Sequence, residues 1–413
     1  MKSIILTIGD ELLIGQVVNT NASSIARKLN GAGIEVVRML TVADEEEEIV
    51  KAFEEAFPAF DVVVVTGGLG PTHDDVTKKA VCRFFHTDLV SDPDARKSIE
   101  NFLKERNYAW SAASEEQSLV PRGAVVIPNN HGTAPGELFE RENKFFIVLP
   151  GVPHEMEFMM DDFVVPYFKS KGGGTFILHR TLKTIGISET VLAARLGPTG
   201  DFLDRARLAF LPSPSGVRMR ITVVDADRRA AEERIGRIES HIRVKAGSYV
   251  YGTGEEDLEE VVGKMLRERR LKIAVAESCT GGLIGHKLTD VPGASGYLDR
   301  VVVAYSNVSK TDLLGVPPGL IEQHGAVSRE VAEAMASGVR TRAGADIGIS
   351  TTGIAGPDGG SPEKPVGLVW IGYSDAATTS AAEFRFGTER LIVKERAAQA
   401  ALDRVRRGLL GIG

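Results

Sequence analysis

The sequence predicts an α/β protein in three parts, and three observations support this fold class. Strand and helix patterns alternate over the first 170 residues, which is typical of a doubly wound sheet. Short β-branched runs such as Asp61–Thr66 are typical of buried parallel strands. Glycine-rich breaks at Lys171–Gly174 and Gly252–Gly254 separate stretches of different pattern. We therefore expect domains at residues 1–170, 175–251 and 255–413, which fits a chain of 413 residues at about 150 residues per domain.

The first domain alternates strands and helices, and glycines mark where several of them end. The first strand stops at Gly9 and the first helix at Gly31, because glycine interrupts regular structure. The carboxylates at 44–48 suit the positive end of a helix dipole and indicate a solvated first turn. The expected strands are Ser3–Ile8, Ile34–Thr41 and Asp61–Thr66, and the expected helices are Asn21–Gly31, one starting near Asp44, and Val76–Phe85.

The middle domain has the pattern of a small α+β module. Ser188 is placed to cap a helix after the first strand of this module. Residues 197–200 (GPTG) match the spacing of the GxxG loop of KH modules. That loop has no Lys or Arg and is followed by Asp201, so a structural turn is favoured. The expected elements are strands at Phe176–Thr184, Ala209–Leu211 and Val217–Val223, and a charged helix at Asp225–Lys245.

Charge and composition exclude several classes of function. The chain has 49 Lys plus Arg against 56 Asp plus Glu, a net charge of −7, which argues against nucleic acid or an anionic membrane as the main partner. Two cysteines, Cys82 and Cys279, cannot make a disulfide framework or a four-cysteine zinc site, so we expect a cytoplasmic protein. No stretch approaches the ~20 apolar residues of a transmembrane helix, and the N-terminus predicts a strand and not a signal peptide.

Three glycine-rich loops of the first domain stand at expected strand ends, where open α/β sheets bind ligands. The densest follows the strand at 61–66, and the others span residues 129–136 and 149–156. Glycines let the backbone approach a phosphate closely, and the start of the next helix supplies N–H donors. The candidate phosphate contacts in the densest loop are Thr66, Gly67, Gly68, Gly70 and Thr72.

Two carboxylates, Asp74 and Asp75, follow this loop and would repel a bare anion. A divalent metal held by both would remove that repulsion, polarise a phosphoryl oxygen and activate water. The alternative is that one of them merely caps the helix at 76–85. The loop is no Walker motif, because the spacing and the Lys-Ser/Thr ending are absent.

The third domain opens with a helix ending in Arg267-Glu268-Arg269-Arg270 and a strand at Lys272–Ala276. Two candidate nucleophiles, Ser278 and Cys279, follow this strand. At such a turn, helix N–H groups lie nearby to hold an oxyanion or a phosphate. A serine needs a base, and Lys310, which follows the strand Arg300–Tyr305, can serve if it is desolvated. No histidine adjoins either motif, which favours Ser–Lys over Cys–His chemistry. The alternative is that Ser278 is only a helix cap.

Other residues of these motifs are candidates to contact a substrate. Thr280, Gly281 and Gly282 form the turn after the nucleophile, and Gly353 and Gly356 belong to a loop placed to close the pocket.

Seven motifs, in this order, resemble those of the CinA family, the competence/damage-inducible protein A, over essentially the whole chain. GDELLIG (9–15), TGGLGPTHDDVT (66–77), HGTAPG (131–136) and LPGVPHEM (149–156) are similar to its molybdopterin-binding-like N-terminal domain. AESCTGG (276–282), AYSNVSK (304–310) and TGIAGPDGG (352–360) resemble its C-terminal nicotinamide-nucleotide amidase domain. The middle domain resembles a KH-type fold, with no RNA binding implied.

The resemblance implies a bifunctional hydrolase of pyridine-nucleotide salvage. The C-terminal domain would convert nicotinamide mononucleotide to nicotinate mononucleotide and ammonia without a cofactor. Ser278 would be the nucleophile, Lys310 the base, and Tyr305 a polar partner that orients or relays the proton. The N-terminal domain would cleave ADP-ribose with a divalent metal, and the assembly would be a homodimer.

Two alternatives remain beside this interpretation. The N-terminal domain would instead transfer or bind a nucleotide in molybdopterin chemistry, although the fused amidase domain speaks against it. Or the chain would be a non-catalytic nucleotide-binding regulator linked to competence. The intact set of Ser278, Tyr305 and Lys310 argues against such a regulator, and the acidic balance gives no support to DNA binding.

Overall fold

The computed structural model describes residues 1–70, 72, 75–171, 176–214 and 216–412. The predicted linker glycines at 172–174 lie outside the described residues. The chain forms two compact units, Met1–Leu178 with Val223–Glu233, and His179–Thr222 with Arg234–Gly413. Three larger sheets flanked by helices confirm the predicted α/β fold class. In the described ranges, no helix has the length and apolar character needed to cross a membrane.

The N-terminal sheet has six strands, and its centre is parallel. β1 pairs in parallel with both β2 and β3, which places Leu6 beside Leu40 on one side and Val65 on the other. Two antiparallel strands extend the far edge. In sheet order the strands are β2 (Glu35–Val42), β1 (Lys2–Ile8), β3 (Val62–Thr66), β8 (Lys144–Leu149), β7 (Gly136–Arg141) and β6 (Val125–Ile127).

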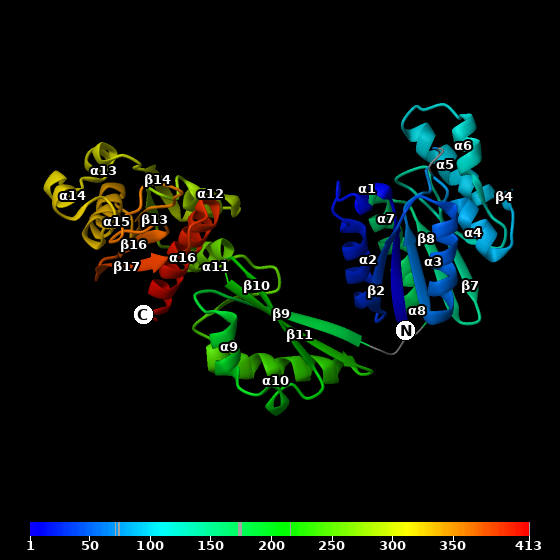
Figure 1. Ribbon diagram of the computed structural model, residues 1–413, viewed down its shortest axis with the longest axis horizontal. Helices are drawn as coiled ribbons and strands as arrows, with labels where there is room; N and C mark the ends of the chain where they lie inside the picture. Colours follow the sequence, from blue (N-terminus) through cyan, green and yellow to red (C-terminus); the bar gives the residue numbers. More distant parts are fainter. Residues whose placement is uncertain (71, 73–74, 172–175, 215, 413) are drawn as a thin grey trace. The chain divides into compact units, whose positions relative to one another are not determined.

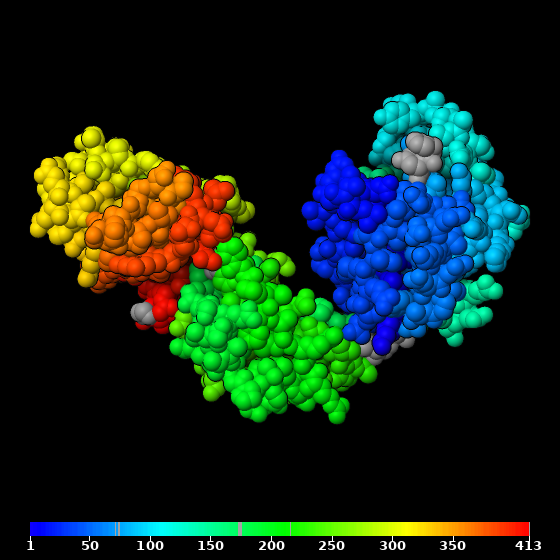
Figure 2. Space-filling view, viewed as in Figure 1, coloured from blue at the N-terminus to red at the C-terminus, as the bar shows by residue number. Residues whose placement is uncertain are grey.

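Helices cover both faces of this sheet, as a doubly wound fold requires (Figure 1). One face packs on α2 and α7 through apolar residues such as Ile25 and Met156. The other face packs on α3 and α4 through an aromatic cluster, in which the ring centroids of Phe53 and Phe146 lie 4.9 Å apart. In the space-filling view, the side chains of the blue segment form a continuous surface on the near side of this unit (Figure 2). The helices are α1 (Asp10–Leu13), α2 (Thr20–Gly31), α3 (Glu46–Ala59), α4 (Thr77–Phe85), α7 (Pro153–Met159) and α8 (Val165–Ser170), with a π-helical turn at Met160–Val164.

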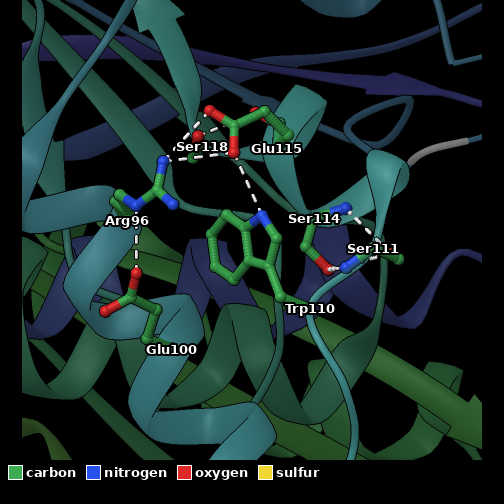
Figure 3. A network of polar contacts seen from close by, with 7 residues as sticks. All are labelled: Arg96, Glu100, Trp110, Ser111, Ser114, Glu115 and Ser118. Atoms are coloured by element: carbon green, nitrogen blue, oxygen red, sulfur yellow. Dashed lines mark hydrogen bonds and ion pairs between the residues drawn. The ribbon is translucent and has the colours of Figure 1, made fainter.

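A separate segment between α4 and β6 contains β4 (Leu89–Ser91), α5 (Pro93–Glu105), α6 (Ala112–Gln117) and β5 (Leu119–Pro121). Arg96 holds it together, because its guanidinium binds Glu115 at 3.1 Å and Glu100 at 3.0 Å and lies over the Trp110 ring (Figure 3). The hydroxyl of Ser98 on α5 donates to the carbonyl of Asn129 at 3.1 Å. The segment thereby supports the glycine-rich loop at 129–136.

The middle sheet is antiparallel where its pairing is described and follows the order β10 (Arg207–Ser213), β11 (Gly216–Asp225), β9 (Phe176–Thr184) and β12 (Val250–Thr253). Its helices are α9 (Glu189–Leu196) and α10 (Arg228–Ala246). Ser188 caps α9 as predicted, accepting from the N–H of Val191 at 3.4 Å. The GPTG segment ends α9 at Gly197 and continues into a short 3-10 turn at Thr199–Asp201, which is the structural turn expected there.

The C-terminal sheet has the order β14 (Leu298–Val303), β13 (Ile273–Glu277), β15 (Ile347–Gly353), β16 (Leu368–Ser374) and β17 (Thr379–Arg385). β13 pairs in parallel with β14 and β15, and the last two strands are antiparallel. The predicted strand at 300–305 ends at Val303, so Tyr305 lies in the turn after it. The helices are α11 (Leu258–Arg269), α12 (Leu283–Asp290), α13 (Asn307–Leu314), α14 (Pro318–His324), α15 (Arg329–Ala343) and α16 (Arg390–Leu410), with a 3-10 turn at Ala294–Gly296.

Candidate active site

The central strand of the C-terminal sheet delivers Ser278 to the carboxyl edge. β13 ends at Glu277, which lies opposite Val303 of β14 and Thr351 of β15. The N–H of Ser278 donates to the carbonyl of Thr351 at 2.9 Å, so the backbone pairing of β13 with β15 extends to the serine. Ser278 is 7% exposed. This is the edge at which open α/β sheets place their ligands.

The turn after Ser278 is held by its own neighbour, Glu277. The buried carboxylate of Glu277 accepts from the N–H groups of Gly282 and Gly285 at 2.8 Å and of Ile284 at 3.2 Å. Gly281 and Gly282 have φ values of 63° and 97°, a conformation that other residues adopt only at a cost. The helix N–H groups expected to hold an oxyanion or a phosphate are therefore partly occupied by Glu277.

Lys310 reaches Ser278 from the adjacent strand–helix turn. Ser306 caps α13 by accepting from the N–H of Ser309 at 3.0 Å, and Lys310 follows one turn into that helix. Its Nζ lies 3.1 Å from the hydroxyl oxygen of Ser278. The same Nζ donates to the carbonyls of Ala304 at 3.1 Å and Tyr305 at 3.2 Å. Two residues 32 positions apart in the sequence thus form a direct hydroxyl–amine pair.

The surroundings of Lys310 favour its neutral form. Lys310 is 1% exposed, and burial lowers the pKa of its ammonium below the ordinary value, because a charged group loses hydration there. No carboxylate among the described residues forms an ion pair with it. A neutral amine within hydrogen-bond distance of a serine hydroxyl is the arrangement a general base requires.

Cys279, the rival nucleophile, is buried in an environment that keeps it as a thiol. Burial raises the pKa of Cys279 to about 12. Because the thiolate and not the thiol is the reactive species, the raised pKa of Cys279 disfavours it as the nucleophile and favours Ser278.

Tyr305 is placed differently from the two residues it was grouped with. Its carbonyl binds Lys310, whereas its side chain is 61% exposed and its hydroxyl lies 3.2 Å from Nη2 of Arg390. Arg390 Nη1 also donates to the carbonyl of Gly356 at 2.7 Å. Arg390 therefore ties the tyrosine to the loop at 353–360, and neither the pattern of α16 nor any motif pointed to this arginine.

The remaining candidates of this domain have structural partners. The hydroxyl of Thr280 lies 2.7 Å from that of Thr351, which joins the turn after the nucleophile to β15. Gly353 ends β15, where a Cβ would stand 2.6 Å from the carbonyl oxygen of Leu368. These contacts fix the backbone around Ser278.

In the N-terminal domain, the three glycine-rich loops meet. Gly67 N–H donates to the carbonyl of Leu149 at 3.2 Å, and the Thr66 hydroxyl donates to that of Pro150 at 2.8 Å. A Cβ on Gly67 would stand 2.2 Å from the carbonyl oxygen of Ile8, so this close approach requires glycine. Both Gly67 and Gly68 adjoin α4, because the Thr77 hydroxyl donates to the Gly67 carbonyl at 2.9 Å and the Thr77 N–H donates to the Gly68 carbonyl at 3.2 Å.

Two residues not singled out from the sequence complete this loop cluster. Asn21 donates from Nδ2 to the carbonyl of Gly151 at 2.7 Å, and its buried Oδ1 has no hydrogen-bond partner among the described residues. Asn129 donates to Glu155 at 2.7 Å, and burial raises the pKa of Glu155. Both stand within or beside recognised motifs, but short polar residues in such loops are common, so their spacing alone did not mark them.

The predicted metal pair is only half visible, because Asp74 lies outside the described residues, as does His73. Asp75 accepts through Oδ2 from the backbone N–H of Thr72 at 2.8 Å and from its hydroxyl. Asp75 does not cap α4, whose N-cap is Val76. A Cβ on Gly70 would stand 2.5 Å from Oδ2 of Asp75. Within the described ranges no three His, Cys, Asp or Glu side chains gather as a metal-binding group.

Comparisons with known proteins cover the whole chain. Residues 255–409 match the family described as "CinA C-terminal domain", residues 4–170 match "Probable molybdopterin binding domain", and residues 179–252 match "Damage-inducible protein CinA KH domain". A CinA-like protein of Salinibacter ruber is 44% identical over 411 residues, covering 99% of this chain and 100% of its own. One of Chlorobaculum tepidum is 45% identical over 420 residues, covering 99% and 98%. The solved structure of competence/damage inducible protein CihA from Agrobacterium tumefaciens is 37% identical, covers 38% of this chain and 97% of its own, and superposes with a TM-score of 0.36.

Proposed function

Because this chain belongs to the CinA family, we propose that its C-terminal domain hydrolyses the carboxamide of nicotinamide mononucleotide, giving nicotinate mononucleotide and ammonia. The observation that carries the proposal is the 3.1 Å contact between Lys310 Nζ and the Ser278 hydroxyl in a buried setting. The nicotinamide nucleotide itself comes from the family resemblance of the motifs.

The reaction proceeds by acyl transfer. Neutral Lys310 takes the proton of Ser278 while the hydroxyl oxygen attacks the amide carbon. Protonated Lys310 then gives that proton to the departing nitrogen, and ammonia leaves an ester on Ser278. A water molecule gives a proton to Lys310 as its oxygen attacks the ester. Lys310 then returns that proton to the departing serine oxygen, which restores both residues, and the acid released ionises to the carboxylate. No step needs a cofactor.

The test is ammonia release from nicotinamide mononucleotide by the purified full-length chain and by Ser278→Ala. We expect the variant to lose several orders of magnitude in rate, since removing one member of a catalytic unit removes most of its effect, while its circular dichroism stays that of the wild type. A wild type that releases no ammonia, or an active Ser278→Ala, contradicts the proposal.

The N-terminal loop cluster supports a second candidate, the cleavage of ADP-ribose. Its three loops converge at strand ends, and the buried Oδ1 of Asn21, which has no partner among the described residues, leaves an acceptor for a ligand donor. No group of three His, Cys, Asp or Glu side chains in the described ranges is placed to hold a metal ion. Hydrolysis of ADP-ribose, measured with and without EDTA, tests both the activity and its dependence on a divalent ion.

A further inference from the structure

We infer that Lys394, with Arg390 one turn before it on α16, forms the subsite that binds the phosphate of the nucleotide held at Ser278; this inference rests on the proposed amidase function. Both side chains come from a helix that no motif marked.

At the helix N-terminus beside Ser278, Glu277 already occupies several of the N–H groups that could bind a phosphate. Helix N-termini commonly bind anions through their free N–H groups, but at α12 three of these groups already bind the carboxylate of Glu277. A phosphate brought there would meet a buried like charge and not free donors. The negative charge of the substrate must therefore be met by side chains.

Lys394 is a cation at this turn that pairs with none of the described residues. Its Nζ lies 3.7 Å from the position a Cβ would take on Gly281, three residues after the nucleophile. Lys394 is half-buried, and among the described residues it has no hydrogen bond or ion pair. Lys287 on α12 shows the contrast, because its ammonium is paired with Glu395 at 2.9 Å. A half-buried cation without a counter-ion gains most from an anionic ligand.

Arg390 adds a second positive charge on the same side of the helix. Residues four apart on a helix are surface neighbours, so the two side chains leave α16 together. The contacts of Arg390 with Tyr305 and Gly356 place its guanidinium at the rim of the Ser278 site. These two contacts use only part of its five N–H donors. Two cations match the charge of a phosphate monoester, which approaches −2 at neutral pH.

The subsite predicts selectivity between two substrates that carry the same amide. Nicotinamide mononucleotide has the phosphate, and nicotinamide riboside lacks it. Charge-assisted contacts to a part of the substrate that does not react strengthen the ground and transition states alike, so their loss raises KM and leaves kcat nearly unchanged.

The experiment compares ammonia release from both substrates by the wild type, Lys394→Ala, Lys394→Arg and the control Lys264→Ala, which removes an exposed lysine of α11. We expect Lys394→Ala to lower kcat/KM for the mononucleotide about 10- to 100-fold, mainly through KM, and to leave the riboside unchanged. Lys394→Arg should restore most of the loss. An equal loss on both substrates, or no loss on the mononucleotide, overturns the inference.

A binding measurement separates this inference from the proposed function. Calorimetric titration of nicotinamide mononucleotide into Ser278→Ala, with and without Lys394→Ala, needs no turnover. If the wild type releases no ammonia but binding weakens with Lys394→Ala, the subsite stands and the amidase proposal falls. Binding that does not depend on Lys394, or no binding at all, overturns the subsite whatever the activity.

Discussion

Replacing Lys310 by methionine separates its chemistry from its packing. Methionine fills nearly the same buried space, whereas alanine would leave a cavity at a position that is 1% exposed. The change removes the base, so we expect kcat for ammonia release to fall about 10²- to 10⁴-fold. It also deprives the carbonyls of Ala304 and Tyr305 of a donor, at a cost of roughly 1 kcal/mol each. The free energy of unfolding should thus fall by no more than about 2 kcal/mol.

The assay is ammonia release under saturating substrate, paired with urea unfolding of the same preparation. A folded Lys310→Met variant that keeps more than about a tenth of the wild-type kcat would show that another group accepts the serine proton. A variant that fails to fold is replaced by Lys310→Gln, whose amide can donate to one of the carbonyls but is not a base.

The remaining predictions test charge, the rival nucleophile, the N-terminal site and the assembly. Because burial lowers the pKa of Lys310 and the neutral amine is the active form, kcat/KM should rise with pH through that lowered pKa, a limb that a pH profile of Lys310→Met should lack. In the same window the unfolded chain binds the proton more tightly, so urea titrations should show the unfolding free energy of the wild type rising with pH relative to Lys310→Met. Cys279→Ala should retain ammonia release, since a thiol whose pKa is near 12 takes no part; inactivation would reverse the choice of nucleophile. Asp75→Asn should abolish hydrolysis of ADP-ribose and spare the amide reaction, and unchanged cleavage would remove Asp75 from that site. Light scattering should give a homodimer, which would cover exposed apolar residues such as Val308, and a monomer mass at micromolar protein would contradict it.

Sequence patterns predicted β1, α2 and β13 to within one residue at each end, because breaks in the apolar pattern mark where these elements stop. The segment from β4 to β5 and the strands β15 to β17 were not predicted. The family resemblance, carried by seven motifs, is confirmed by relatives that match the chain along its whole length. Ser278 and Lys310 were predicted together because each follows one of two neighbouring parallel strands, whose carboxyl ends share an edge of the sheet. Their proximity follows from the order of the strands, which the sequence pattern indicates.

Other features of the site depend on side-chain direction, which a pattern does not contain. Glu277 looks like the last residue of a strand, yet its carboxylate turns back to bind the start of α12. Tyr305 belongs to the same motif as Lys310, but its hydroxyl lies beside Arg390. Arg390 and Lys394 stand on a charged helix 80 and more residues later, where cations ordinarily face solvent. The N-terminal metal stays a prediction, because half of its expected ligand pair is not described.

The binding of Glu277 to the N–H groups at the start of α12 has a consequence for how this domain can diversify. Two contacts stabilise the turn after Ser278. The carboxylate of Glu277 accepts from N–H groups at the start of α12, and the hydroxyl of Thr280 contacts that of Thr351. The cations of α16 take no part in these contacts. In the proposed subsite, a substitution at Lys394 should therefore change which amide substrate is accepted without disturbing the contact between Ser278 and Lys310. Reactivity and substrate recognition would then reside on separate segments of the chain, and one could change while the other is retained.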